Sequence, residues 1–449
     1  MTDQLKEAAE KVVQRAVRMG ATSADVLIRE DDTFSVSVRM GEVETLKQAI
    51  SRNVLLRVFV GKRTATSTTS DLSPGVVNRL VDDTVEMARI TSEDESGGLP
   101  DASLFGNDFP DLELLDTTWE NLSPPDRIDM AIRAERAALK AHPGIVNSEG
   151  ATFDYSRSCT VVGNSSGFFG EYEGTGGGIA AAPVVQSQGG MQRDLWMSVS
   201  RRVDGLESPE EIGRKAAERA LRRLDARKIS TCEVPVVFDP MTARSLVGHI
   251  FQAVAGESIY RRMSFLIDEV GKRVAAPGVT IVDDARLRGG LGSSPFDDEG
   301  IPTQTTPVIE DGVLRNYLHT AYSARKLGTR PTGNGTRAAT GTVTIGPTNF
   351  YLKNGAHTPE EIIASVKSGL YLVELIGFGV NGVTGDYSKG AVGIWIENGK
   401  LSYPVHEITI AGNLRQMFEN IEMVGNDLAF LGSVAAPTIK IKKMVISGD

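Results

Sequence analysis

The first part of the chain alternates between helical and strand-like hydrophobic patterns. Apolar residues recur at helical spacing over Leu5–Met19, and Gly20 is a typical C-terminal stop. Segments of alternating polarity then predict antiparallel hairpin strands: Asp25–Arg29, Phe34–Arg39, Val43–Lys47, Val54–Val60 and Thr64–Ser67. Pro74 begins a second predicted helix, which runs to Ile90, because the missing proline N–H costs little in a first helical turn.

The same order of elements returns after Glu93–Asp111, a connection rich in Gly, Asp and Pro. The pattern predicts two helices and three strands: helices Pro125–His142 and Pro209–Leu224, and strands Ser156–Val162, Gly167–Glu173 and Leu195–Val203. The run Gly174–Gly178 is not followed by the residues of a phosphate-binding loop, so it predicts a flexible or close-packed strand. We infer a duplicated layer of helices and antiparallel strands.

The second half, from about Val234, is rich in Gly and in short alternating segments, which predict a β-rich domain. The pattern predicts two helices, Met241–Ala255 and Thr358–Lys367, and the strands Val234–Phe238, Val279–Val282, Val343–Ile345, Tyr371–Glu374, Ala391–Ile396 and Ile439–Val445. The expected fold is therefore α+β. Two N-terminal α/β domains, 1–110 and 111–228, precede a β-rich C-terminal domain, 229–449.

Composition and charge narrow the function classes. A chain of 449 residues with 41% hydrophobic content can bury substantial cores. Its net charge of −10 repels a phosphate backbone, so direct binding to nucleic acid is disfavoured. The segment Met1–Arg18 lacks the apolar stretch of a secretion signal, and no segment approaches the apolar length of a membrane-spanning helix. We therefore expect a cytoplasmic protein without membrane contact.

Candidate catalytic residues are few. Cys159 and Cys232, the two cysteines, are too few for a disulfide framework or a thiolate zinc site and are expected to be small buried residues. A hydrolytic zinc site needs three protein ligands, and the five histidines do not form a recognisable set: His142, His249, His319, His357 and His406. His406-Glu407 resembles the start of a zincin motif, but no second histidine follows at the required spacing. The chain also lacks a GxSxG motif.

Two acidic runs, Asp283-Asp284 and Asp297-Asp298-Glu299, lie in segments bounded by Gly and Pro. Such carboxylates can bind a hard cation or act as acid and base, but in these loops they are more typical of solvated turns. An independent enzyme that uses the Asp297 loop is the weakest of three functional hypotheses. It would gain support if Asp297, Asp298 and a histidine shared one deep pocket.

Five motifs in the second half resemble the TldD/PmbA family, once described as modulators of DNA gyrase: Ser294–Gly300 (SPFDDEG), Tyr322–Gly328 (YSARKLG), Thr384–Ser388 (TGDYS), Glu407–Leu414 (EITIAGNL) and Val424–Asp427 (VGND). Thr69–Pro74 is a weaker match. The resemblance covers nearly the whole chain, and it is closer to the PmbA/TldE branch than to TldD.

The resemblance implies that a metal site has been lost. The TldD branch carries an HExxxH helix and a C-terminal cysteine that together hold zinc. The matching helix here, Ser245–Glu257, has Val247, Gly248 and Gln252 at the three key positions. These residues supply no lone pair, no carboxylate and only a neutral amide, respectively. His249 is about 200° round the helix from Val247. No cysteine follows Asp427, so we expect no catalytic, cofactor-binding or metal-binding residue in this chain.

The function implied by the resemblance is that of a non-catalytic subunit. The chain would pair with a zinc-bearing TldD-like subunit in a heterodimeric metalloprotease complex that processes or degrades small unfolded peptides and proteins. An extended peptide would add to an exposed strand edge. Self-association of the isolated chain stays open. The alternative is an interaction protein that acts on gyrase or another partner without proteolysis.

Overall fold

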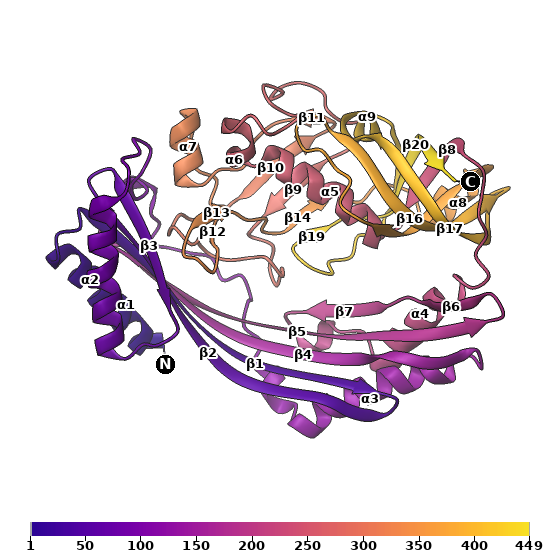
Figure 1. Cartoon of the computed structure of the whole chain (residues 1–449), viewed down its shortest axis with the longest axis horizontal. Coiled ribbons are helices and arrows are strands. Elements are labelled where there is room, and N and C mark those ends of the chain that lie inside the picture. Colours follow the sequence, from indigo (N-terminus) through magenta and orange to yellow (C-terminus); the bar gives the residue numbers. More distant parts are fainter. Residues whose placement is uncertain (1, 449) are drawn as a thin grey trace.

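A long antiparallel sheet dominates the first half of the computed structural model, which describes residues 2–448 (Figure 1). The strand order is β3-β2-β1-β4-β5-β6, and β7 also pairs with β5. The seven strands are β1 (Ser23–Arg39), β2 (Glu42–Val60), β3 (Arg63–Thr69), β4 (Ile145–Asn164), β5 (Phe169–Ser187), β6 (Gly190–Arg193) and β7 (Trp196–Ser200). Strands β1 and β4 pair from Asp25↔Asn164 to Val38↔Ala151, so the two predicted layers share one sheet.

Strands β1 and β2 are each continuous, and the predicted breaks within them are wrong. The acidic run Glu30–Asp32 interrupts the apolar alternation of β1, but charge pairing keeps it in the sheet. Arg52 of β2 pairs with the buried Glu30 across the strands, and Arg29 pairs with Asp31 at 3.0 Å. The predicted strands 156–162 and 167–173 are likewise parts of the longer β4 and β5. The cross-strand pair of Glu30 and Arg52 therefore suits the polar segment of β1 to a place in the sheet.

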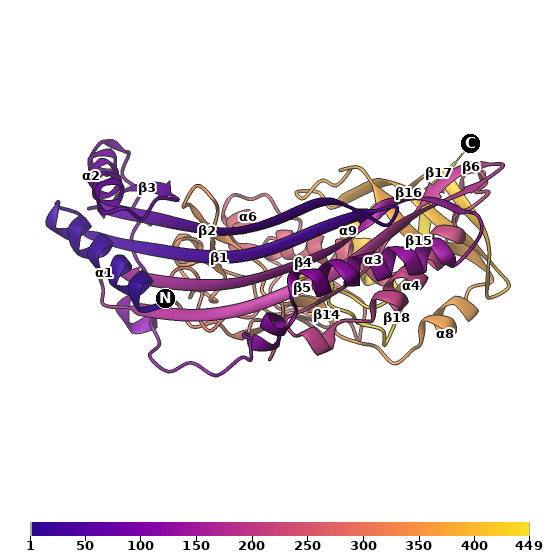
Figure 2. The ribbon, with the colours of Figure 1, turned by 90° about the horizontal axis from the view of Figure 1, so that it is seen from below.

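Four helices cover one face of this sheet: α1 (Thr2–Arg18), α2 (Pro74–Ile90), α3 (Pro124–Lys140) and α4 (Pro209–Leu221). They confirm the four predicted N-terminal helices, with small differences at the ends. Val26 and Ile28 pack with α1 and α2, whereas Phe34 and Val36 pack with α3 and α4. The two helix pairs thus lie at opposite ends of the long strands (Figure 2).

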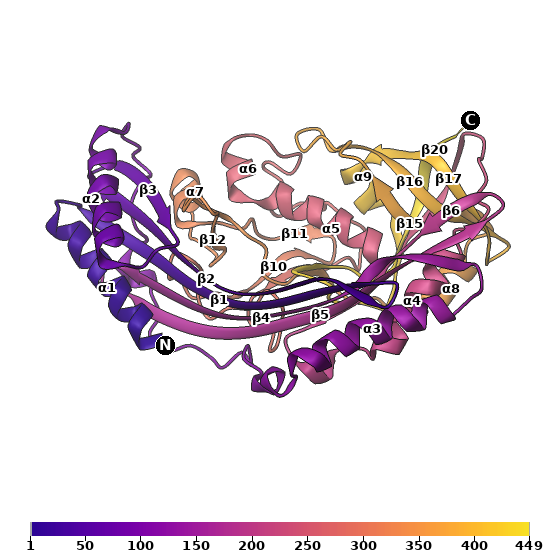
Figure 3. The ribbon, with the colours of Figure 1, turned by 60° about the horizontal axis from the view of Figure 1, so that its bottom comes forward.

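The other face of the sheet meets the C-terminal region. Because successive strand residues point to opposite faces, Leu27 points away from the helices. It packs with Phe168 and with Phe296 of the second half. The sheet curves around the C-terminal region, which lies on its inner side while the helices lie on the outer side (Figure 3).

The C-terminal region is β-rich, as predicted, and it contains three sheets. Strand β20 pairs with both β8 and β17, so β17, β16, β15, β8 and β20 form a closed ring, to which β18 adds. The ring and its added strand comprise β8 (Cys232–Phe238), β15 (Ser368–Ile376), β16 (Asp386–Glu397), β17 (Lys400–Asn413), β18 (Ile421–Val424) and β20 (Ile439–Ser447). The fold is therefore α+β.

Two smaller sheets and five helices complete the region. The order of the five-stranded sheet is β11-β10-β9-β14-β19, and β12 pairs only with β13. Their strands are β9 (Ile281–Asp284), β10 (Thr305–Glu310), β11 (Val313–Leu314), β12 (Gly335–Arg337), β13 (Val343–Ile345), β14 (Phe350–Leu352) and β19 (Val434–Ala435). The helices are α5 (Pro240–Val254), α6 (Gly256–Tyr260), α7 (Ala321–Leu327), α8 (Pro359–Ala364) and α9 (Leu414–Glu419).

Helix α5 matches the helix predicted over 241–255, whereas α8 is shorter than the prediction over 358–367. Thr358 caps α8, but the chain leaves the helix after Ala364 and enters β15 at Ser368. Within residues 2–448, no helix combines the length and the apolar character that a crossing of the bilayer requires.

Candidate functional site

Helix α5 is the element that the family resemblance matches to the metal-binding helix of the TldD branch. The Oδ1 atom of Asp239 caps it by accepting the N–H of Thr242 at 2.9 Å. Three residues of its inner face, Leu246, Val247 and Ile250, are buried in the core. The outer face carries Arg244, Ser245, Gly248, His249 and Gln252, and these residues line two cavities.

The three positions matched to metal-binding residues do not converge. Val247 is 0% exposed and packs in the core, Gly248 lines one cavity, and Gln252 lines the other. These residues do not fit a zinc ion, because the carbon side chain of Val247 cannot coordinate it and points away from the other two positions. Among residues 2–448, no group of three or more His, Cys, Asp or Glu side chains is arranged to hold a metal.

His249 shares a cavity with Gln252, on the side of α5 away from the buried Val247. Burial, and to a lesser degree the charge of Lys389, lowers the pKa of His249 to about 4, so its ring is neutral at pH 7. The ring packs edge-on against Tyr387, with 6.1 Å between the centroids. Within residues 2–448, neither Nε2 of His249 nor Oη of Tyr387 has a hydrogen-bond partner, although both atoms are buried.

Two cavities flank the outer face of α5. The first, of about 590 Å³, is called here the histidine cavity, and it is lined by His249, Gln252, Glu257, Arg261, Phe378 and Lys389, among others. The second, of about 570 Å³, is called the arginine cavity, and its lining includes Arg193, Arg219, Arg223, Arg244, Gly248 and Lys389. Lys389 of β16 lines both, so the two cavities are neighbours. Burial lowers the pKa of Lys389.

The charge in the arginine cavity is unbalanced. Five cationic side chains but only two acidic ones, Asp194 and Glu374, line it. Arg219 lies 3.4 Å from Asp194 and 3.2 Å from the buried Asp239, and Arg223 pairs with Glu374. This cavity has no signature in the sequence, because its cations come from separate elements. Its single local signal is Arg244, which lies one turn before Gly248.

A third cavity, of about 310 Å³, continues from the histidine cavity toward the long sheet, where Phe59, Tyr260 and Tyr322 line it. The two cavities share four lining residues, Glu257, Arg261, Thr344 and Ile345. Strand β13 therefore lines both of these adjacent cavities, which together are called the groove.

One edge of β13, a strand that lines the groove, carries backbone groups that do not pair with β12. Gly346 N–H donates to Asn334 O and Ala338 N–H donates to Thr342 O, both at 2.9 Å. Since ladder bonds alternate along an antiparallel pair, the backbone groups of Val343 and Ile345 point away from β12. Among residues 2–448, no further strand pairs with β13. An extended chain can therefore bond to this edge.

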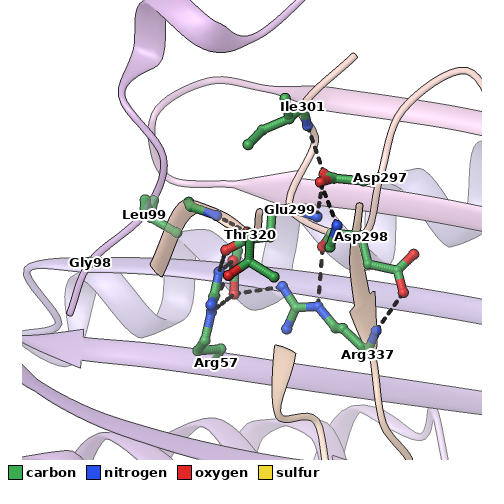
Figure 4. Close-up of polar contacts among 12 residues, drawn as sticks. Arg57, Gly98, Leu99, Asp297, Asp298, Glu299, Ile301, Thr320 and Arg337 are labelled. Atoms are coloured by element: carbon green, nitrogen blue, oxygen red, sulfur yellow. Dashed lines mark hydrogen bonds and ion pairs between the residues drawn. The ribbon is translucent and has the colours of Figure 1, made fainter. Parts of the chain in front are cut away.

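The acidic loop around Asp297 is buried, and the prediction of a solvated turn is wrong. The Oδ1 atom of Asp297 accepts the N–H groups of Glu299 and Ile301 at 2.9 and 3.0 Å, and its Oδ2 atom accepts that of Gly335 at 2.8 Å (Figure 4). Asp283, in the other acidic run, is also buried. The cavity lined by Asp297 and Asp298, about 500 Å³, has no histidine among its described lining residues. The arrangement therefore positions the loop and gives no support to an independent acid–base site.

The remaining candidates are four histidines and the two cysteines. His319 is buried, and burial lowers its pKa to about 4. The exposed His142 accepts the N–H of Gly144 through Nδ1 at 3.0 Å. His357 and His406 each lie 3.9 Å from a glutamate. Both cysteines are free thiols; Cys159 is buried, and Cys232, predicted to be buried, is only half-buried.

Family models match most of the chain. The PmbA/TldA metallopeptidase domain 1 matches residues 24–88, the central domain matches residues 118–224 and the C-terminal domain matches residues 231–448. The chain is similar to the metalloprotease PmbA of Escherichia coli O157:H7, with 37% identity over 99% of this chain and 98% of the relative. It is 35% identical to the PmbA homologue of Haemophilus influenzae, over 99% and 96% of the two chains.

Solved structures agree with these matches. A Bacteroides thetaiotaomicron protein described as a candidate modulator of DNA gyrase superposes with a TM-score of 0.92 and 28% identity, over 100% of this chain and 99% of its own. The fold is also that of TldE from Thermococcus kodakarensis, with a TM-score of 0.89 and 22% identity over 98% and 100% of the chains. The five motifs, the domain matches and the fold together establish that this chain belongs to the PmbA/TldD family.

Proposed function

We propose that this chain is the non-catalytic subunit of a cytoplasmic, two-chain metallopeptidase. Its partner is a zinc-bearing, TldD-like subunit, and the pair cleaves small unfolded peptides and proteins. The observation that carries the proposal concerns α5. Gly248 and Gln252, on its outer face, occupy positions matched to the HExxxH residues of the TldD branch but offer no carboxylate or imidazole. Val247, at the third matched position, is buried in the core. A scaffold that keeps the cavities without the ligands suits binding rather than hydrolysis.

The free edge of β13 supports a role in holding substrate. An extended peptide can donate to and accept from the outward backbone groups of Val343 and Ile345, and such bonding requires little sequence selectivity. Replacing alternate peptide amides by N-methyl amides should weaken binding to this chain, because these amides can no longer donate. Equal affinity of the methylated and unmethylated peptides would argue against strand addition.

An apolar rim supports the presence of a partner. Phe378 is fully exposed where it lines the histidine cavity, and Met263, in the same lining, is 56% exposed. Exposed aromatic side chains beside a groove are typical of surfaces that another polypeptide covers. Phe378→Ser should therefore weaken assembly with the TldD-like subunit. Ile90→Ser, at an 84% exposed position of α2, is the matched control.

Co-expression with a TldD-like subunit tests the proposal directly. We expect the two chains to co-elute, with zinc in the partner, and the complex to cleave an unfolded peptide that this chain alone leaves intact. Replacing the HExxxH glutamate of the partner should abolish cleavage. Stoichiometric zinc in the purified chain, or cleavage by the chain alone, would contradict the proposal.

A second candidate function is modulation of gyrase or another partner without proteolysis. Its support is the description of a solved relative as a candidate gyrase modulator. A pull-down from cell extract separates the two candidates. Recovery of an HExxxH-bearing chain favours the protease complex, whereas recovery of gyrase without that chain favours the modulator.

A further inference from the structure

We propose that the arginine cavity binds a carboxylate of the peptide substrate, with Arg244 and Lys389 as its ligands beside Gly248. This inference rests on the proposed function and narrows its substrate to peptides that carry a carboxylate at this position. The carboxylate belongs either to an acidic side chain or to the C-terminus of the peptide.

The two cations lack acidic partners. Among residues 2–448, neither Arg244 nor Lys389 forms an ion pair, whereas Arg219 and Arg223 in the same lining are paired with Asp239, Asp194 or Glu374. In a chain with a net charge of −10, two unpaired cations in one concave site attract an anion from solution. The planar guanidinium of an arginine suits a carboxylate because it can donate to both oxygens.

The site is open at Gly248. A Cβ atom at this position would meet no atom within 4 Å, so a ligand in the cavity that Arg244 and Lys389 also line can approach the backbone of α5. The cavity volume of about 570 Å³ lies within the range of small-ligand sites and can hold a side chain or a chain end.

The position of Lys389 connects this site to the peptide groove. Lys389 lines the histidine cavity as well, and that cavity continues along β13. A peptide that pairs with the edge of β13 and runs toward α5 can therefore place a carboxylate between Lys389 and Arg244. A peptide held in this way would bring its carboxylate to the two cations, whereas a free anion would make no use of the groove. The connection between the cavities therefore favours a peptide carboxylate as the ligand.

Three fluorescent peptides of one length test the proposal with the full-length chain. One is neutral with a C-terminal amide, one has Asp and Glu in place of its Asn and Gln, and one is neutral with a free C-terminal carboxylate. We expect one or both carboxylate peptides to bind about tenfold more tightly than the neutral peptide at low salt. The arm that gains affinity identifies the source of the carboxylate.

Variants of the cavity provide the controls. Arg244→Met and Lys389→Met should each reduce the preference for carboxylate, and Gly248→Glu should abolish it by placing a carboxylate between the cations, whereas Gly248→Gln should retain it. Arg79→Met and Lys400→Met alter exposed cations outside the three cavities and should leave the preference unchanged.

Three outcomes would contradict the proposal in different ways. Equal binding of all three peptides would overturn the carboxylate site while leaving peptide binding intact. A preference that survives in both Arg244→Met and Lys389→Met would also overturn it. If no peptide binds, the proposed function itself fails. Thermal melts of each variant identify any that do not fold.

Discussion

At the scale of single residues, Trp119 requires a glycine at position 177, within the glycine run of β5. Trp119 is fully buried, and a Cβ atom on Gly177 would lie 2.5 Å from its ring and 2.6 Å from the Asp154 carbonyl oxygen. Gly177→Ala should therefore lower the free energy of unfolding in urea by about 1–3 kcal/mol. Gly176→Ala is the control, because its Cβ would meet only one atom within 4 Å, at 3.8 Å. Equal losses in the two variants would contradict this packing.

A second prediction at this scale concerns pH. His319 is 5% exposed, and burial lowers its pKa to about 4, whereas histidine in an unfolded chain titrates near 6.5. Between these values the unfolded chain binds more protons than the folded chain, so stability falls as the pH drops from about 6.5 toward 4. His319→Gln should remove about 1–2 kcal/mol of the stability difference between pH 7 and pH 5 in urea titrations. An unchanged difference would exclude a depressed pKa at this residue.

At the scale of the element, a histidine substitution should destabilise the protein strongly on the inner face of α5 and only slightly on its outer face. Val247→His buries a polar ring in the core and should cost about 2–4 kcal/mol of unfolding free energy. Gln252→His changes an exposed position and should cost less than about 0.5 kcal/mol. Because position 247 faces the core, the combined Val247→His, Gly248→Glu and Gln252→His variant should bind no stoichiometric zinc by metal analysis. Tight zinc binding by this variant would contradict the prediction, because it would show that α5 can rotate and bring position 247 out of the core.

The sequence predicts α5 because helical periodicity is a local property. The prediction misses the arginine cavity, because Lys389 and Arg223 reach it from β16 and from the segment after α4. It assigns Asp297 and Glu299 to a solvated turn because two groups that stabilise them in the interior are distant in the chain: Gly335 donates to Asp297 and Arg57 pairs with Glu299. The burial of a charged residue is therefore predicted wrongly when the group that stabilises it lies on an element distant in the sequence.

At the scale of the whole molecule, buried ion pairs connect the long sheet to the C-terminal region. Arg57 of β2 lies between Asp25 of β1 and Glu299, with 3.1 Å from its Nη2 to Oε1 of Glu299 (Figure 4). The other carboxylate oxygen of Glu299 accepts the N–H of Ala321 at 2.8 Å, where α7 begins. The same cluster thus fixes the sheet and a helix that borders the third cavity.

Protonation of this cluster should make the contact between the long sheet and the C-terminal region depend on pH. Burial alone would raise the pKa of Asp25, but Arg337 and Arg57 together hold it below its usual value. The unfolded carboxyl titrates near 3.9, so the stability contributed by these pairs is present above that value and is lost as the pH falls below it. Acid unfolding should therefore begin with separation of the sheet from the C-terminal region, seen as protease cleavage between residues 224 and 232 before the sheet itself unfolds. Simultaneous loss of both halves would contradict this order.

Removing Arg57 tests how strongly the two halves depend on the cluster. Arg57→Met leaves Glu299, whose side chain is 0% exposed, without its cation, and should cost about 3–5 kcal/mol of unfolding free energy. Arg202→Met is the matched control. Its pair with Asp204 is 55% and 71% exposed, so its loss should leave the free energy of unfolding nearly unchanged. Adding Glu299→Gln to Arg57→Met should recover part of the loss, because the uncompensated charge is then removed. A double variant as unstable as the sum of the two single variants would mean that Arg57 and Glu299 act independently, and the connection would then depend on the Arg337–Asp25 pair and on the apolar contact of Phe296 with the sheet.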